Sequence, residues 1–255
     1  MKHITALGPI LAAAAVVSLS AQSQGITLIQ SETRDGKATT TLTQMDKSHI
    51  RTETGSGVFI FDGDAQVMRM VNMERKSYTE VTKADMQKMS QQMSAAMEKM
   101  KEMPPAQRAM MEKMMAGRGM PGAGPAAAPL AYKATGSDKA GQWACAKYDG
   151  MRATEKAVEL CTVEPKALGL TPADFEVAKQ LAEFMKSIVP QMADQIAVHG
   201  TTAEQGFSGF PIRRSHFSNG KVTSVSELKE IKREAIPASA WQAPAGFKRE
   251  SFGGR

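Results

Sequence analysis

The chain has 255 residues, 42% of them hydrophobic, and a formal net charge of +6 that arises from 32 basic and 26 acidic residues. This composition is typical of a globular protein with a buried core, and it excludes a wholly disordered chain. The two signs of charge are mixed along the sequence, so they indicate solubility and not nucleic-acid binding. A single long apolar run, at the N-terminus, excludes a polytopic membrane protein.

The N-terminus has the pattern of a secretory signal peptide. Lys2 precedes an apolar run from Ile10 to Leu19, and small residues follow this run. Because the run is short for a membrane span, we predict that residues 1–23 are a signal peptide, cleaved after Ser20 or Ser23. We expect a periplasmic or secreted protein with no stable membrane span after cleavage, in an oxidising compartment.

Residues 24–81 predict five or six short β-strands. Stretches rich in Val, Ile, Thr and Phe are separated by turn residues at Asp35-Gly36, Gly55-Ser56-Gly57 and Asp62-Gly63-Asp64. Connections this short favour an antiparallel meander.

A methionine-rich insert over residues 82–116 predicts two helices. Thr82 and Asp85 have the spacing of a capping box, and methionines then recur every three or four residues, which is a helical period. Pro104-Pro105 ends the first helix. The Gly-, Pro- and Ala-rich stretch at residues 117–130 predicts a disordered linker.

The second half of the chain returns to β-strands. Two strands flank a predicted turn at Gly150 to Glu155, and a helix begins at Thr171 with Pro at its first position. Asn219-Gly220 favours a β-hairpin, and a last short strand is expected between Ala245 and Ser251. The element order predicts an α+β fold in which both halves of the chain build one antiparallel sheet, with the helices packed on one face.

The two cysteines predict a disulfide. Cys145 and Cys161 lie on the strands that flank the turn near Gly150, and residue 153 is their midpoint. Opposite residues of a hairpin share a constant index sum, so we expect the two cysteines to face each other directly, near disulfide reach. A redox-active pair and two free thiols are the alternatives, and the absence of a C-x-x-C motif disfavours the first.

Six short segments, spread over most of the chain, occur in a fairly specific order and spacing. They are Ile50–Glu53, Lys76–Glu80, Trp143–Tyr148, Gly209–Arg213, Ile236–Ser239 and Pro244–Lys248. These segments resemble a family of exported bacterial proteins known as domain of unknown function 4412, which is similar to the outer-membrane lipoprotein-sorting carriers. The resemblance implies a single carrier-like domain over residues 24–255: a curved antiparallel sheet, or incomplete barrel, with helices over the concave face, where the related carriers hold acyl chains. It implies no catalytic residues.

We expect neither catalysis nor a metal or cofactor. His49, His199 and His216 are far apart and lack the spacing of metal ligands. Gly206-Phe207-Ser208-Gly209 lacks the second Gly that a nucleophile elbow requires, so we interpret it as a turn.

The chain therefore predicts a non-enzymatic periplasmic protein. Its partner would be a hydrophobic small molecule or lipid, or an apolar segment of an envelope protein, held between the curved sheet and the helices. The predicted lining residues are Phe175, Leu181, Phe184, Met185 and Ile188. A mobile cover is predicted from Met89, Met93, Met97 and Met100, since Met side chains adapt to varied partners.

Two alternatives remain open for the insert. Met86/Met89, Met97/Met100 and Met111/Met114 have M-x-x-M spacing, and thioethers are soft ligands for copper(I), although the insert contains no His or Cys. The protein could instead be a structural envelope component whose protein partner docks on the Met helices.

Overall fold

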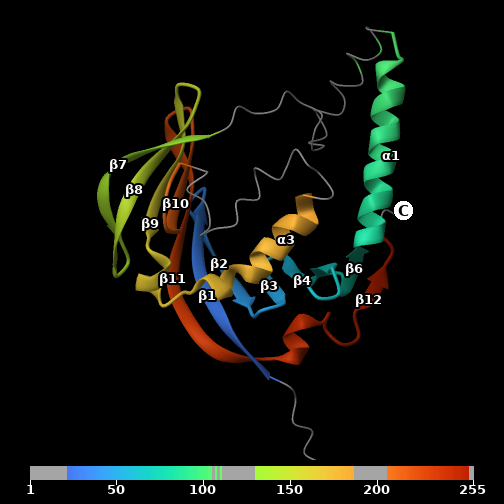
Figure 1. Ribbon diagram of the computed structural model, residues 1–255, viewed down its shortest axis with the longest axis horizontal. Helices are drawn as coiled ribbons and strands as arrows, with labels where there is room; N and C mark the ends of the chain where they lie inside the picture. The colour runs from blue at the N-terminus through green and yellow to red at the C-terminus, as the bar shows by residue number, and fades with distance from the viewer. Residues whose placement is uncertain (1–21, 105–106, 108–109, 111–129, 187–205, 253–255) are drawn as a thin grey trace, which may run out of the picture.

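The structure, a computed structural model, describes residues 22–104, 107, 110, 130–186 and 206–252 (Figure 1). The predicted signal peptide as far as residue 21, most of the predicted second Met helix and nearly all of the predicted linker lie outside these residues.

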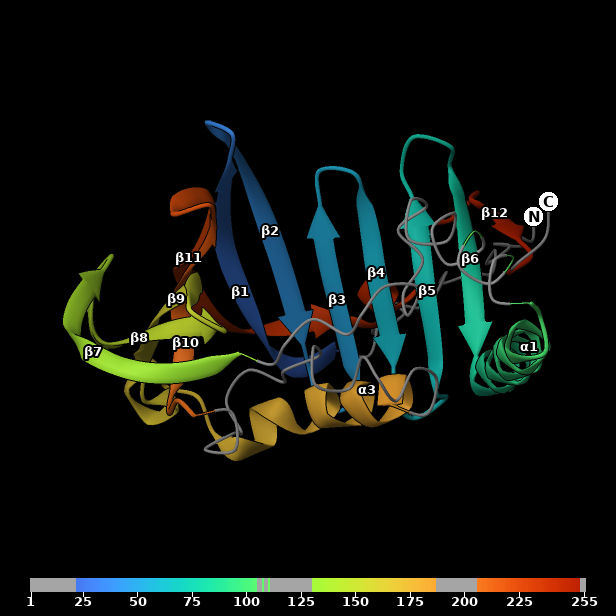
Figure 2. The same cartoon turned by 90° about the horizontal axis from the view of Figure 1, so that it is seen from above.

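Twelve strands form one large, curved sheet that is open (Figure 2). In the N-terminal half they are β1 (Gln22–Arg34), β2 (Lys37–Met45), β3 (His49–Thr54), β4 (Gly57–Asp62), β5 (Val67–Asn72) and β6 (Ser77–Thr82). In the C-terminal half they are β7 (Ala131–Ala140), β8 (Trp143–Arg152), β9 (Glu155–Val163), β10 (Phe210–Ser218), β11 (Lys221–Pro237) and β12 (Lys248–Glu250). The expected curved antiparallel sheet is confirmed, except that β12 pairs with β6 in parallel.

The two halves of the chain meet at β1 and β11. The strand order is β12-β6-β5-β4-β3-β2-β1-β11-β10-β9-β8-β7, so two meanders share one central seam. The seam runs from the Gln22–Pro237 pair to the Arg34–Ser224 pair, with a bulge next to Ile29. The two meanders therefore form one continuous sheet, in which each completes the hydrogen bonds of the other's innermost strand.

Two α-helices and three short 3₁₀ segments accompany the sheet in the described residues. They are α1 (Lys83–Lys101), η1 (Pro165–Leu168), η2 (Pro172–Phe175), α3 (Glu176–Lys186) and η5 (Ala238–Trp241). Figure 1 shows α3 between the β7–β10 end of the sheet and α1, which stands beside β6 at the other end.

Helix α1 begins at the predicted capping box. The Thr82 backbone N–H donates to Asp85 Oδ2 at 3.0 Å, and the Asp85 N–H donates to Thr82 Oγ1 at 3.2 Å. These bonds satisfy backbone donors that the first helical turn leaves free. The helix ends at Lys101, shortly before Pro104-Pro105, as predicted.

Helix α3 packs on a continuous apolar row that crosses six strands. The row consists of Ile26, Met45, Ile50, Phe61, Met68 and Val81, each paired directly with the next. All six side chains are buried, and the Phe184 ring of α3 lies 5.4 Å from the Phe61 ring. Each fully buried side chain of this size stabilises the fold by about 1.5–3 kcal/mol, so this row anchors the helix.

The C-terminal segment covers part of the opposite face of the sheet, at β3–β5. Val58, Ile60 and Val71 form a second cluster against Ala243 and Phe247. Nearby, the His49 ring stacks on Trp241 of η5, with ring centroids 5.0 Å apart. Both faces of β4 are therefore covered over at least part of their length.

One predicted turn is wrong in position. Gly150 was expected to open the turn, but β8 continues to Arg152, and Ala153, with φ of 53°, lies in the turn. Gly150 lies opposite Tyr132, and a Cβ at Gly150 would come within 2.7 Å of the Tyr132 ring. The glycine therefore leaves space for an aromatic ring on the neighbouring strand and is not part of the turn.

Candidate functional site

The face that carries α3 has a second row that the helix does not bury completely. On every strand this row lies two residues from the buried row, on the same side of it. It consists of Leu28, Thr43, Thr52, Phe59, Met70 and Thr79. Leu28 is buried, but Met70 is 43% exposed and the other four are half-buried. From β2 to β6 a strip of partly exposed side chains therefore borders the core.

A hollow of about 410 Å³ lies over this strip at β3–β6. Phe59 and Met70 supply apolar surface to it, and Thr52, Thr79 and Glu250 are among its polar lining residues. Phe59 also packs against the main core, so the hollow continues the apolar interior toward the surface. The hollow therefore offers apolar surface at Phe59 and Met70 within a largely polar lining.

A smaller and more polar hollow of about 190 Å³ lies at β1, β10 and β11. Its lining residues are Gln30, Glu32, Arg34, Pro211, Ile212, Arg214, His216, Ser224 and Ser226. Glu32 pairs with Ser226 across the seam, and Ser226 pairs with Arg214. The alternation along β1, which is in regular register with β2, places Gln30, Glu32 and Arg34 on the same face as Leu28. Both hollows therefore open on one face of the sheet.

The charges in the smaller hollow are unequal. Glu32 is paired with Arg34, at 3.1 Å between Arg34 Nη2 and Glu32 Oε1. Among the described residues no carboxylate pairs with Arg214, which is half-buried. Burial lowers the pKa of the Arg214 guanidinium, but an arginine remains charged in proteins. The hollow therefore holds one positive charge that no neighbour compensates.

His216 responds to this excess charge. Its pKa lies below the ordinary value of 6.5, because of partial burial and the positive charges of Arg214 and Arg34, while Glu32 acts in the opposite direction. The imidazole is therefore neutral at pH 7 and can donate one hydrogen bond.

The predicted lining residues of α3 are brought together, but most belong to the core. Phe175 and Phe184 are 4% and 3% exposed, and Leu181 and Met185 are partly buried against them. Neither hollow is lined by a residue of α3. Ile188 lies outside the described residues.

The predicted methionine cover is described only at its base. Met86 is 4% exposed and belongs to the core, and Met89 packs against it. The backbone of Met93, Met97 and Met100 belongs to α1, but their side chains lie outside what the structure describes. The first M-x-x-M pair therefore takes part in packing.

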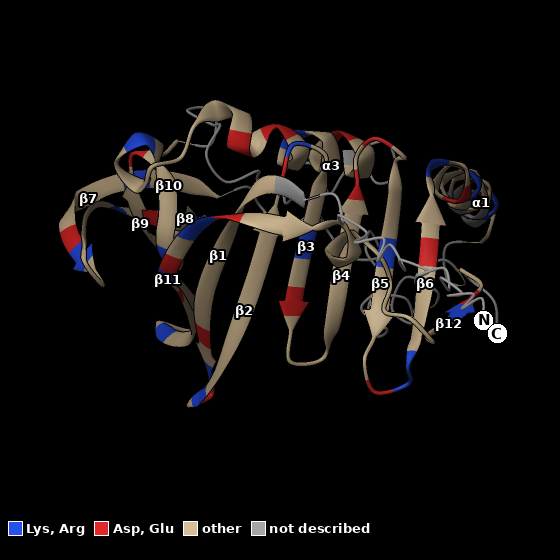
Figure 3. Ribbon diagram, turned by 90° about the horizontal axis from the view of Figure 1, so that it is seen from below, with Lys and Arg blue, Asp and Glu red and all other residues tan. Residues whose placement is uncertain are grey.

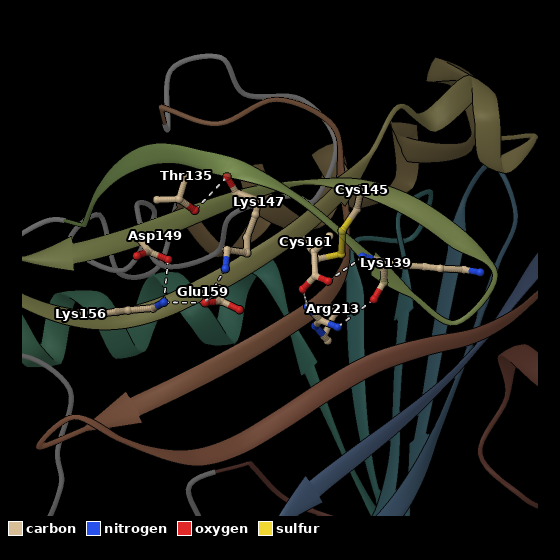
Figure 4. A network of polar contacts seen from close by, with 10 residues as sticks. Thr135, Lys139, Cys145, Lys147, Asp149, Lys156, Glu159, Cys161 and Arg213 are labelled. Carbon is tan, nitrogen blue, oxygen red and sulfur yellow. Dashed lines mark hydrogen bonds and ion pairs between the residues drawn. A yellow bond between two sulfur atoms is a disulfide. The ribbon is translucent and has the colours of Figure 1, made fainter.

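The predicted disulfide between Cys145 and Cys161 is present, with 5.4 Å between the Cα atoms (Figure 4). The expectation that the two residues face each other directly is wrong. Cys161 lies opposite Lys147, two residues from the expected partner. One residue of this offset comes from the turn, where Arg152 pairs with Glu155, and the other from a register shift at Gly150/Met151 that adds one residue to β9. The bond therefore crosses the strand pair diagonally.

A polar network surrounds the disulfide hairpin. Lys156 lies between Asp149, at 2.7 Å, and Glu159, and Arg213 pairs with Asp138 on β7 (Figure 4). Elsewhere in the described part of the molecule, basic and acidic residues are interspersed (Figure 3). Such mixed pairs stabilise exposed strands by small amounts.

Within the described ranges, no three His, Cys, Asp or Glu side chains are grouped so that they could hold a metal ion. The same ranges contain no helix with the length and apolarity needed to cross a membrane. Ser208 of the Gly206–Gly209 turn lies 3.1 Å from the Tyr148 hydroxyl, and Phe207 is buried beside Tyr132.

Three site residues, Phe59, Met70 and Arg214, were not predicted. The run from Val58 to Phe61 is apolar at every position, and such a run signals a strand covered on both faces without showing which side stays open. Arg213 and Arg214 are neighbours on one strand and point to opposite faces, and only the fold decides which of them finds a carboxylate.

No family model matches the chain, and no curated protein matches it significantly. Among solved structures it is similar to an uncharacterized conserved protein from Thermus thermophilus, with a TM-score of 0.46 and 9% identity over 92% of each chain. It is also similar to PNGF-II, with a TM-score of 0.36 and 9% identity. That alignment covers 90% of this chain and 31% of PNGF-II. Both TM-scores lie below 0.5, so neither similarity indicates a function for this chain.

Proposed function

We propose that the protein is a non-enzymatic binding protein for an amphiphile, whose apolar part lies on the open row of the α3-bearing face. One observation carries this proposal. The row under α3 is buried, whereas the next row leaves Phe59 and Met70 beside a hollow of about 410 Å³. Apolar surface that borders a core and stays open is a common feature of ligand-binding grooves.

We further propose that this face is the concave one and that α1 closes over it as a cover. Two features support this arrangement: α1 follows β6 directly near the edge of the same sheet, and among its described side chains Met86 and Met89 at its base pack with the core. The disulfide fits an oxidising compartment, in line with a periplasmic location and with membership of the exported family that the sequence resembles.

The test uses a neutral fluorescent probe, N-phenylnaphthylamine, which is displaced by lysophosphatidylcholine. Met70→Glu places a charge in the hollow and should weaken probe binding about tenfold or more, since burial of an unpaired charge is costly. Met73→Glu is the matched control, because Met73 is 44% exposed and does not line the hollow. Equal binding by the two variants would refute the site.

Native mass spectrometry of protein purified from its own compartment separates the alternatives. A retained lipid mass supports the proposal. A copper adduct supports the metal-binding alternative, and a bare mass together with no probe binding supports a structural role with a protein partner only.

A further inference from the structure

The smaller hollow contains a positively charged side chain without an ion-pair partner and two hydroxyl groups without hydrogen-bond partners in the described residues. Arg214, Ser226 and Ser224 line it together, and in the described part of the chain none of their side chains has a hydrogen-bond or ion-pair partner. Leaving a half-buried guanidinium unpaired is unfavourable for folding. Together, a guanidinium and two hydroxyl groups can donate several hydrogen bonds to one oxyanion, which accepts several at once.

The neighbouring charges favour an anion over a cation. Glu32, the single acidic residue of the hollow, is already held by Arg34, and His216 is neutral at pH 7 and can donate. The net charge of the lining is therefore positive. The polar rim also borders apolar residues, because Ile212 and Pro211 line the same hollow and both are buried.

The two hollows lie on the same face of the sheet. In the sheet order, β4 with Phe59 lies five strands from β10 with Arg214, which is about 24 Å along the sheet at roughly 4.8 Å per strand. Leu28, whose side chain is buried, lies in the row between them. The distance between the two hollows is comparable with the length of a long acyl chain.

We propose that the Arg214 hollow binds an anionic group, a carboxylate or a phosphate. If the protein binds an amphiphile as proposed above, this anionic group is the head group of an acidic amphiphile, and this assignment rests on the proposed function. A free carboxylate or phosphate ion has the same chemistry and is the alternative ligand.

The experiment compares oleate with oleamide, which has the same chain and a neutral head group, and includes inorganic phosphate as the free anion. Oleate and oleamide are measured by displacement of N-phenylnaphthylamine, and phosphate by calorimetry. Arg214→Gln should weaken oleate binding about tenfold or more and leave oleamide unchanged, since one charge-assisted pair is lost. Arg214→Lys should retain part of the affinity. Arg213→Gln is the matched control, because Arg213 pairs with Asp138 away from the hollow.

The outcomes separate the two proposals. If both lipids bind and Arg214→Gln affects neither, the binding function stands and the anion site is refuted. If neither lipid binds but phosphate binds in an Arg214-dependent way, the anion site stands with a free oxyanion as ligand, and the amphiphile function is refuted. If no anion depends on Arg214, the anion site is refuted. Circular dichroism of each variant confirms that the sheet is folded.

Discussion

Arg233 and Asp174 form a two-point ion pair that ties the segment before α3 to the central strand β11. Arg233 Nη2 lies 2.6 Å from Asp174 Oδ2, and Nη1 lies 3.1 Å from Oδ1. Arg233 also donates to the Gly169 carbonyl, and Asp174 accepts from the Thr171 backbone N–H at 2.6 Å. Because Arg233 lies opposite Ile26, this exposed contact joins the segment before α3 to the sheet beside the end of the buried row.

Asp174→Asn should lower the free energy of unfolding by about 1 kcal/mol, because the charge-assisted bonds to Arg233 become neutral ones while the cap to Thr171 is partly kept. Burial alone raises the pKa of Asp174, but the hydrogen bonds from Arg233 and Thr171 outweigh it, so the pKa lies below its ordinary value of 3.8. The stabilisation is therefore complete above pH 3.8 and is lost as the pH falls through the lowered pKa. Urea unfolding of both proteins across this range measures the difference, and a gap that persists unchanged at the lowest pH would contradict the assignment.

Loss of the disulfide should destabilise the fold without affecting binding. The cysteines are 16 positions apart, and the chain-entropy relation gives about 3 kcal/mol for a loop of this size. The Cys145→Ser, Cys161→Ser double variant should therefore melt at a lower temperature and bind N-phenylnaphthylamine as the wild type does, because neither cysteine lines a hollow. Protein denatured without reduction should not react with an alkylating reagent, and two alkylated cysteines in that sample would show that the bond is absent.

Phe184→Ala should cost about 3–5 kcal/mol, since it opens a cavity against Phe61 in a core where both rings are buried. Glu183→Ala, at an exposed position of the same helix, serves as the control and should change stability by less than about 0.5 kcal/mol. Chemical denaturation measures both values. A small effect of Phe184→Ala would mean that α3 is not held by this row.

The outer part of α1 should open more readily than the sheet. Met86 and Met89 attach the first turns to the core, whereas Gln91, Gln92 and Lys99 are exposed. Hydrogen exchange should therefore be faster over residues 91–101 than over β1, and it should slow on addition of lysophosphatidylcholine if α1 closes over the ligand. Exchange as slow as that of β1, unaffected by the amphiphile, would exclude a mobile cover.

Local sequence signals determined the elements of this fold. The turns at Asp35-Gly36 and Asn219-Gly220 contain residues with positive φ, and the Thr82/Asp85 cap begins α1, as predicted. These features depend on the conformational preferences of a few adjacent residues, so they can be derived without knowledge of the rest of the chain. The pairing of Cys145 with Cys161 followed in the same way from their positions on one hairpin.

The tertiary structure alone decided which side chains share a face and which of them stay open. A single extra residue in β9 moved Cys161 from a position opposite Ala146 to one opposite Lys147, and one residue of register decides the face of every later side chain on a strand. Phe59 and Phe61 are two positions apart on β4, yet only Phe61 is fully buried, next to α3, because the helix covers one row and leaves the next. Arg214 became a candidate anion ligand for the same reason: its lack of a partner depends on strands that are far apart in sequence, and no local pattern encodes that.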